Sequence, residues 1–299
     1  MGGVTLADNG PDNDFLADRN VLFVRLKYRI DGALLDRAPA LKVIVSPTTG
    51  HNHIDCDALQ ARGIALLSLK GETEFLESIR ATPEHTFGLL LALVRNYRHA
   101  FRDTCNREWN RDAYRGEEIA GMKVAMVGYG RVGRRVTEYL RAFGAQVRWI
   151  DPAPKLGTCD PGRADDLLGL ITWSRAVILA ASHDPASSLL FDRRAIAALS
   201  GRYLINTARG ELIDEDALLE AIEFERLAGV AVDVICSETG ENQLARWLTL
   251  ADRRNVIVTP HIGGATWTSM QATEEFMTAK LIAFLEGKSV GPTEGNANG

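Results

Sequence analysis

The apolar positions of this chain fall into short runs of strand length, which alternate with segments in which apolar residues recur at helical spacing. In the first part of the chain this pattern predicts strands at 21–24, 41–45 and 64–67, with helices at 32–37 and 54–59. The second helix has an acidic first turn and stops at Gly63. The alternation predicts a small parallel α/β unit.

The segments on either side of this unit have different patterns. Residues 1–20 are rich in Gly, Asp and Asn and lack apolar periodicity, which predicts a mobile tail. After the polar segment 68–80, a long helix is predicted over 83–101, with Thr82 suited to its N-cap. Residues 102–118 are charged and aromatic without a clean period, so we expect them to connect to a second domain.

The stretch 124–151 has the most specific pattern in the chain. An apolar strand at 124–127 runs directly into Gly128-Tyr129-Gly130-Arg131-Val132-Gly133. An apolar stripe at helical spacing follows and stops at Gly144, and a second apolar strand ends in Asp151. Strand, glycine turn, helix, strand and terminal acid stand in the order that a dinucleotide-binding unit requires.

Each part of that unit has a physical reason. The first glycine permits a tight turn, the second lets the backbone approach a pyrophosphate, and the third lets helix and strand pack closely. The helix N-terminus supplies amide donors and a positive dipole end. Asp151 would accept hydrogen bonds from the adenosine ribose and repel a 2′-phosphate, which predicts NAD as the cofactor rather than NADP. The alternative, a glycine turn that binds no ligand, is disfavoured by the elements around it.

Beyond Asp151 the alternation continues. A loop is expected at 152–163, and a long final helix at 269–286 is expected to return to the first domain. Between them, further helices are predicted at 165–170, 192–199 and 214–226, and further strands at 176–181, 203–206, 230–234 and 256–258. Counted from Val124, six strands alternate with helices, which predicts an α/β fold with a doubly wound parallel sheet of the Rossmann type.

Composition narrows the class of protein. The net charge is −5 and the basic residues are scattered, which argues against a nucleic-acid surface. The four cysteines are far apart and form no CxxC pair, which favours reduced thiols in a cytoplasmic protein. No signal peptide and no apolar run of about eighteen residues is present, so we expect no membrane association. His51 and His53 form an HxH pair but have no third ligand at suitable spacing, so no metal is expected.

Three polar residues follow strand ends in the second half of the chain: Arg209, Glu238 and His261. Ligands of an open parallel sheet bind outside the carboxyl ends of its strands, so all three should face the cleft of the glycine loop. Hydride transfer at a carbon bearing a hydroxyl needs a proton donor and acceptor, for which His261 is suited. Arg209 can hold a substrate carboxylate with a bidentate fork, and Glu238 can orient the imidazole and favour imidazolium. Taken singly, each could be a surface or core residue; together and in order they favour catalysis.

These residues resemble the D-isomer-specific 2-hydroxyacid dehydrogenases, the group that includes phosphoglycerate dehydrogenase. The segments VGYGRVG, NTARG, DVICSE and PHIGGAT look like that family's signature segments and stand in its order. The resemblance implies that Arg209 binds the substrate carboxylate, that His261 is the acid/base paired with Glu238, and that Asp233 lies near the nicotinamide carboxamide. It implies NAD contacts from Gly128, Gly130, Arg131, Val132, Gly133, Asp151, Thr207, Ala208, Asp233, Gly263 and Gly264.

The same resemblance implies a domain organisation and a partner. A flavodoxin-like substrate domain would comprise residues 21–100 and 270–299, and the NAD-binding domain residues 101–269. The family begins with one more strand and helix than the pattern from Val21 provides, so the small domain is expected to be shortened at its N-terminus. A small-molecule 2-hydroxy or 2-oxo acid would be the substrate, and a homodimer through the NAD-binding domain, with the aromatic connector as a contact, would be the assembly.

Several positions depart from the family pattern. Thr239 stands where the family commonly has a proline after the catalytic glutamate. Ala180-Ala181-Ser182 stand where the family often has a histidine, after the strand that ends near Leu179. Segment 68–80 is longer than its counterpart and carries Lys70 and Arg80, which could reach a second anionic group on the substrate or be solvated loop charges. Gly50 and His51, in the loop at 46–53, are further candidates for substrate contacts.

Two alternatives to an active enzyme remain open. One is an NAD(H)-sensing interaction protein, like the family's transcriptional corepressors, with little or no turnover. The other is a cofactor-binding protein with a defective substrate cleft. The intact set of Arg209, Glu238 and His261 favours the enzyme.

Overall fold

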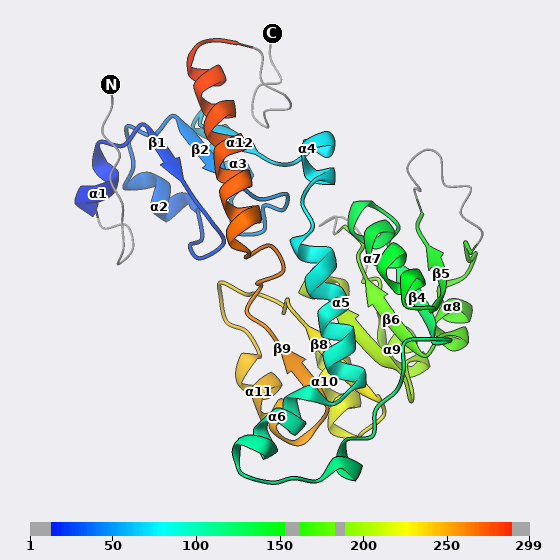
Figure 1. Ribbon diagram of the computed structural model, residues 1–299. Helices are drawn as coiled ribbons and strands as arrows, with labels where there is room; N and C mark the ends of the chain where they lie inside the picture. Colours follow the sequence, from blue (N-terminus) through cyan, green and yellow to red (C-terminus); the bar gives the residue numbers. More distant parts are fainter. Residues whose placement is uncertain (1–12, 153–161, 183–188, 289–299) are drawn as a thin grey trace. The chain divides into compact units, whose positions relative to one another are not determined.

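The computed structural model describes residues 13–152, 162–182 and 189–288 of the chain. It divides into two compact units (Figure 1). The first comprises Met1–Ile79 and Trp267–Gly299, and the second comprises Arg80–Thr266. The expected tail up to residue 12, most of the expected loop at 152–163 and the last eleven residues, 289–299, lie outside the described residues.

The first unit is built on a three-stranded parallel sheet of order β1 (Val21–Phe23), β2 (Val43–Ser46) and β3 (Ala65–Ser68). Its register places Val43 opposite both Val21 and Ala65. Helices α2 (Gly32–Asp36) and α3 (Cys56–Ala61) begin after Asp31 and Asp55, whose carboxylates accept hydrogen bonds from backbone amides of the first turn. These elements confirm the strands and helices predicted for this part of the chain.

Two helices of this unit were not expected. Helix α1 (Asn13–Ala17) places Leu16 in the core beside Ile30 and Leu35, so the prediction of a tail was wrong for this part of residues 1–20. A single buried leucine among polar residues gives no periodic signal, which is why the pattern missed it. Helix α4 (Thr73–Glu77) lies within the polar segment 68–80 and buries Leu76.

The long C-terminal helix α12 (Trp267–Leu285) packs on β2 and β3. Met277 is fully buried there, and Phe276 stacks on Phe75 with ring centroids 4.1 Å apart. Lys280 is buried on the same helix, and its ammonium donates to Glu72 Oε1 at 2.6 Å and to the Ser68 carbonyl at 3.1 Å. A buried charge with two hydrogen bonds thus links α12 to the end of β3 and to Glu72.

The second unit contains a six-stranded parallel sheet of order β5-β4-β6-β7-β8-β9. The strands are β4 (Lys123–Val127), β5 (Gln146–Ile150), β6 (Ala176–Leu179), β7 (Tyr203–Asn206), β8 (Gly229–Val232) and β9 (Val256–Val258). The α-helices are α5 (Ala81–Val94), α6 (Tyr97–Cys105), α7 (Arg131–Ala142), α8 (Leu167–Trp173), α9 (Arg193–Ala198), α10 (Glu215–Glu223) and α11 (Leu244–Arg253), and short 3₁₀ turns occur at Arg111–Tyr114 and Gly210–Leu212. The predicted doubly wound α/β fold is confirmed.

Both faces of this sheet are covered by helices (Figure 1). Alternate residues of β4 enter different cores: Val124 and Met126 pack with α5 and α7, whereas Ala125 and Val127 pack with α8, α9, α10 and α11. A strand buried on both faces has no solvated side, so its apolar residues form a continuous run instead of alternating. This explains why the strands of this unit were so clear in the sequence.

The boundary between the units differs from the expected one. Leu89, Leu90 and Leu93 of α5 are buried in the core of the second unit, so this helix belongs there and the first unit ends at Ile79 instead of residue 100. The C-terminal boundary falls between Thr266 and Trp267 instead of at 270. The helix expected over 83–101 is also interrupted, because Asn96 adopts a left-handed conformation (φ 54°) between α5 and α6. Helix α11 was not predicted.

The buried pair Lys280–Glu72 leads to a stability prediction. Glu72→Ala leaves an ammonium group buried without its counter-charge, so we expect the free energy of unfolding to fall by about 3 kcal/mol. Glu274→Ala on α12 is the matched control, because its ion pair with Arg25 is half-exposed and should contribute less than about 1 kcal/mol. Urea denaturation followed by circular dichroism measures both. Equal losses for the two variants would contradict the prediction.

Candidate active site

The order of the strands creates a crevice at one place on the sheet edge. The chain passes from β4 to its neighbour β5 on one side, and then returns to β6 on the other side of β4. In sheets of this order the helices after the two strands diverge, and ligands bind outside the carboxyl ends of the strands at this switch point. The glycine loop 128–133 follows β4 directly and lies at this switch point.

At each of the three glycines of that loop, the structure shows what a side chain would meet. Gly128 has φ +93°, and a Cβ there would lie 2.4 Å from the Ala181 amide nitrogen at the end of β6. A Cβ on Gly133 would lie 2.1 Å from the Gly128 carbonyl oxygen, so α7 can approach β4 only with glycine at this position. Gly130, the N-cap of α7, has open space where its Cβ would be. This space and the free end of a helix of twelve residues fit a pyrophosphate.

Asp151 lies beside this loop at the end of β5. Its carboxylate accepts a hydrogen bond from the Tyr129 amide at 2.7 Å. The ring of Tyr129 stacks on that of Trp149 in β5, with centroids 4.2 Å apart, which further fixes the loop on the sheet. Arg131 and Val132 are half-buried in the first turn of α7. The residues present therefore fit a dinucleotide, and a contact between Asp151 and its ribose stays a prediction.

His261 and Glu238 meet although they come from different loops. The Nδ1 atom of His261 lies 2.6 Å from Glu238 Oε2, and the side chains are 24% and 31% exposed. Both loops contain left-handed backbone at residues other than glycine, His261 itself (φ 53°) and Ser237 (φ 56°). Such conformations cost free energy and persist where the surroundings enforce them. The pairing that the sequence predicted is present, with the imidazole accessible to a small molecule.

Asp233 binds the loop of His261 through hydrogen bonds from three backbone amides. Its carboxylate accepts hydrogen bonds from the amides of Ile262 at 2.9 Å and Gly263 at 2.7 Å, while its backbone oxygen accepts from the His261 amide at 2.9 Å. Burial alone would raise the pKa of Asp233, but hydrogen bonds from His85, Thr259 and these amides outweigh it and hold the pKa below its usual range. The side chain is only 2% exposed, so its visible function is to shape the loop that carries His261.

Arg209 follows β7, and its backbone is fixed by Asn206. The Asn206 side chain accepts from the Ala208 amide at 3.0 Å and donates to the Arg209 carbonyl at 2.9 Å. A Cβ on the next residue, Gly210, would lie 2.2 Å from the backbone of Ile235, so the arginine loop touches the segment that leads to Glu238. The guanidinium of Arg209 donates to the Ala208 carbonyl at 2.6 Å and is half-buried. Arg209, Glu238 and His261 thus stand on three loops that are in contact.

The remaining predicted contacts are distributed over both units. Thr207 and Ala208 are nearly buried beside Arg209, while Gly264 is exposed beyond Gly263. Gly50, His51 and Lys70 belong to the first unit, where the Gly50 carbonyl accepts from Thr48 Oγ1 at 3.0 Å and Lys70 is exposed. Arg80 begins the second unit as the N-cap of α5. The part of these four residues in binding a substrate stays a prediction.

Nothing in the sequence indicated that His85 and Thr86, near the start of α5, contact the loops of the site. His85 Nε2 lies 3.2 Å from both Thr259 Oγ1 and Asp233 Oδ1, and Thr86 Oγ1 lies 2.7 Å from Thr207 Oγ1. The segment Thr82–Thr86 gave only a helix start, since nothing in its spacing indicates which loops it touches. Its polar side chains on an otherwise apolar helix were the available signal.

Two expectations from composition can be compared with the described residues. Among them, no group of three or more His, Cys, Asp and Glu side chains is placed to hold a metal ion. In the same part of the chain, no helix has both the length and the apolar character needed to cross a membrane. Cys56, Cys105 and Cys236 are free thiols, and Cys159 lies outside the described residues.

Known proteins match most of this chain in sequence. The family described as D-isomer specific 2-hydroxyacid dehydrogenase, NAD binding domain, matches residues 87–263. D-3-phosphoglycerate dehydrogenase of Mycobacterium bovis is 32% identical over 269 residues, which are 86% of this chain and 48% of that protein. Glyoxylate reductase of Thermococcus gammatolerans is 28% identical over 286 residues, 92% of this chain and 82% of that protein.

A solved structure extends the similarity to three dimensions. The crystal structure of D-lactate dehydrogenase from Aquifex aeolicus, complexed with NAD and lactic acid, has a TM-score of 0.78 and 27% identity. The similarity covers 92% of this chain and 86% of that one. The chain spans about half the length of the D-3-phosphoglycerate dehydrogenases of Mycobacterium bovis and Bacillus subtilis. With its glycine loop, its sheet order and more than half of its residues matched by the family, this chain belongs to the D-isomer specific 2-hydroxyacid dehydrogenase family.

Proposed function

We propose that this protein is an NAD-dependent oxidoreductase acting on a D-2-hydroxy acid or the corresponding 2-oxo acid. The observation that carries the proposal is the pair His261–Glu238, joined at 2.6 Å on loops at the same sheet edge as the glycine loop. An imidazole with a carboxylate partner is a proton donor and acceptor in a fixed orientation. The matched relatives and the lactate-bound neighbour support a small hydroxy acid as the substrate class.

The roles of the side chains follow from their atoms. Nδ1 of His261 faces Glu238, which leaves Nε2 to give a proton to the carbonyl oxygen of a 2-oxo acid, or to take it from a hydroxyl in the reverse direction. Bound NADH supplies the hydride that the carbonyl carbon receives. Arg209, held by Asn206, binds the carboxylate of the substrate through its planar fork. The glycine loop and Asp151 hold and orient the dinucleotide.

We also propose that the protein is a homodimer. The connector between α5 and β4 exposes large aromatic side chains: Trp109 is 91% exposed and Phe101 is 64% exposed. Large exposed aromatic side chains are enriched at protein interfaces. Sedimentation velocity should give twice the mass of the chain, and Trp109→Glu with Phe101→Glu should shift it toward the monomer. A monomeric wild-type protein at micromolar concentration would exclude this assembly.

Removal of the His261 or the Arg209 side chain should strongly impair turnover, each in a different kinetic parameter. With NADH and a panel of 2-oxo acids, we expect wild-type protein to oxidise NADH, and His261→Ala to lower kcat by roughly a hundred- to ten-thousand-fold. Arg209→Ala should act mainly on kcat/KM, and Arg209→Lys should recover only part of it, because lysine keeps the charge but lacks the fork. NADH binding, followed by fluorescence, should be unchanged in all three variants. Binding of NADH without turnover on the whole panel would favour the NAD(H)-sensing alternative.

Asp151 should set the preference for NAD over NADP. Asp151→Asn removes the charge but keeps the shape and the acceptor for the Tyr129 amide, so NADPH affinity should rise while NADH affinity falls only slightly. Asp151→Ala should weaken NADH binding about tenfold or more, since hydrogen bonds to a charged group contribute about 1.5–3 kcal/mol. Fluorescence titrations with both cofactors give the ratio of dissociation constants. If Asp151→Asn leaves the ratio of the NADH and NADPH dissociation constants unchanged, Asp151 does not contact the cofactor.

A further inference from the structure

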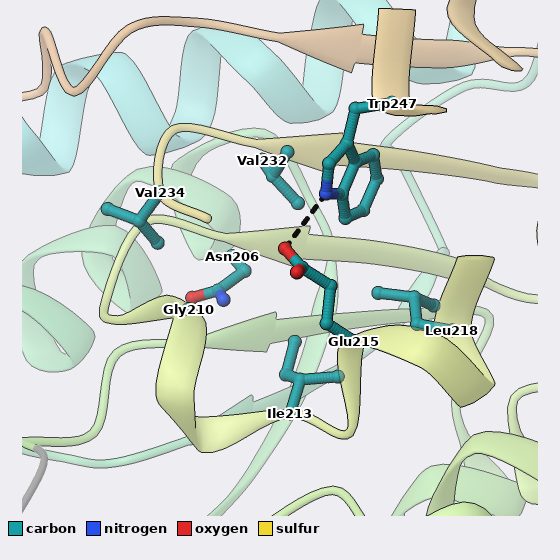
Figure 2. Close-up of a pocket in the computed structure, with 8 residues that line it drawn as sticks. All are labelled: Asn206, Gly210, Ile213, Glu215, Leu218, Val232, Val234 and Trp247. Atoms are coloured by element: carbon teal, nitrogen blue, oxygen red, sulfur yellow. Dashed lines mark hydrogen bonds between the residues drawn. The ribbon is translucent and has the colours of Figure 1, made fainter. Parts of the chain in front are cut away.

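A half-buried carboxylate, that of Glu215, contacts the loop that carries Glu238. Glu215, in the first turn of α10, extends into a space lined by the ends of β7 and β8 and by Trp247 of α11 (Figure 2). The remaining cavity is only about 10 Å³, which is barely enough for one water molecule. This space therefore holds no ligand, and the function of Glu215 must lie in the contacts it makes.

Those contacts anchor both ends of one loop. Glu215 Oε1 accepts hydrogen bonds from the Cys236 amide at 3.1 Å and from Trp247 Nε1 at 2.9 Å, the latter drawn as a dashed line in Figure 2. Its other oxygen, Oε2, accepts from Gln243 Nε2 at 3.3 Å. Cys236 precedes Glu238, and Gln243 is the N-cap of α11 after it. One carboxylate thus holds the chain on both sides of the catalytic candidate.

The loop between these anchors needs such support. Ser237 has φ 56°, and the Ser237 carbonyl accepts from the Gly240 amide at 2.9 Å, so the chain turns sharply next to Glu238. Left-handed backbone at a serine costs free energy, which the surrounding contacts must offset. Trp247 is 2% exposed, so its indole is a rigid donor to Glu215.

We propose that Glu215 is a positioning residue for the proposed dehydrogenase, which fixes the loop 235–243 so that the Glu238 carboxylate meets His261 Nδ1. This inference rests on the proposed function. Glu215 acts through Glu238 and touches neither substrate nor cofactor. Its contribution to turnover should therefore disappear when Glu238 can no longer pair with the imidazole.

The reactivity of the Cys236 thiol gives a second measure of the contact between Glu215 and the loop, one that does not depend on enzyme turnover. Burial first, and then the negative charges of nearby acids with Glu215 foremost, raise the pKa of the Cys236 thiol to about 12. The thiol is therefore protonated and unreactive at neutral pH in the intact loop. Displacement of the loop or removal of the Glu215 charge should make Cys236 more reactive, whereas the exposed Cys105 should be unaffected.

A double-mutant cycle on the full chain tests the proposal. We expect Glu215→Ala to lower kcat about ten- to a hundredfold with NADH affinity within about twofold of wild type, and Glu215→Gln, which keeps an acceptor oxygen for Cys236 and Trp247, to lose less. In a Glu238→Gln background, Glu215→Ala should cost little more. Glu220→Ala is the matched control, because Glu220 lies on the same helix and pairs with Arg193 at the surface. It should leave kcat unchanged.

The outcomes separate this inference from the function on which it rests. If the wild type is active and the double variant loses kcat by the product of the two single losses, Glu215 does not act through Glu238. That result would overturn the positioning role and leave the proposed dehydrogenase activity intact.

Iodoacetamide labelling of Cys236, followed by mass spectrometry, should be faster at pH 8 in Glu215→Gln and Glu215→Ala than in wild type and Glu220→Ala. If the labelling rate is unchanged in these variants, Glu215 does not hold the loop 235–243, whether or not the wild type has turnover. If the wild type has no turnover but labelling responds as expected, only the proposed dehydrogenase activity is contradicted.

Discussion

The constraint on which the second unit depends is the burial of both faces of its parallel sheet. Helices cover each face, so the strands are built mainly from apolar residues, and the candidate catalytic side chains lie in the loops after them. Parallel strands end at one edge, and the glycine loop, Arg209, Glu238 and His261 all follow such ends. The position of the candidate site is therefore a consequence of how the core is built.

Loops at that edge would be mobile without internal anchors, and carboxylates supply them. Asp233 holds the loop of His261 through two backbone amides, Asp151 holds the glycine loop through the Tyr129 amide, and Glu215 holds both ends of the Glu238 loop. Hydrogen bonds from backbone amides to a charged acceptor are stronger than neutral ones. Asp151, Asp233 and Glu215 thus shape loops at this edge, whereas Glu238 pairs with His261.

In the first unit a charged side chain also fixes an element, here the helix that covers the three-stranded sheet. Its sheet has three strands, and α12, from the other end of the chain, completes the cover with Met277 and the ion pair Lys280–Glu72. A buried pair is sensitive to the loss of either partner, which makes the packing of this helix specific. Polar residues on the buried side of α12, among them Ser269, Thr273 and Lys280, show that an apolar stripe is not required for a helix to be a core element.

The sequence by itself determined the two α/β units, the glycine loop with its terminal acid, and the three candidate catalytic residues. Those features are local or repeat with a fixed period: apolar runs, glycines at set spacing and polar residues after strand ends. Only the tertiary structure decided that α5 belongs to the second unit, that α1 exists, and that Glu215, His85 and Thr86 support the site. These facts depend on contacts between residues far apart in the chain, and a hydrogen bond between Glu215 and Trp247 leaves no mark in the spacing of either residue.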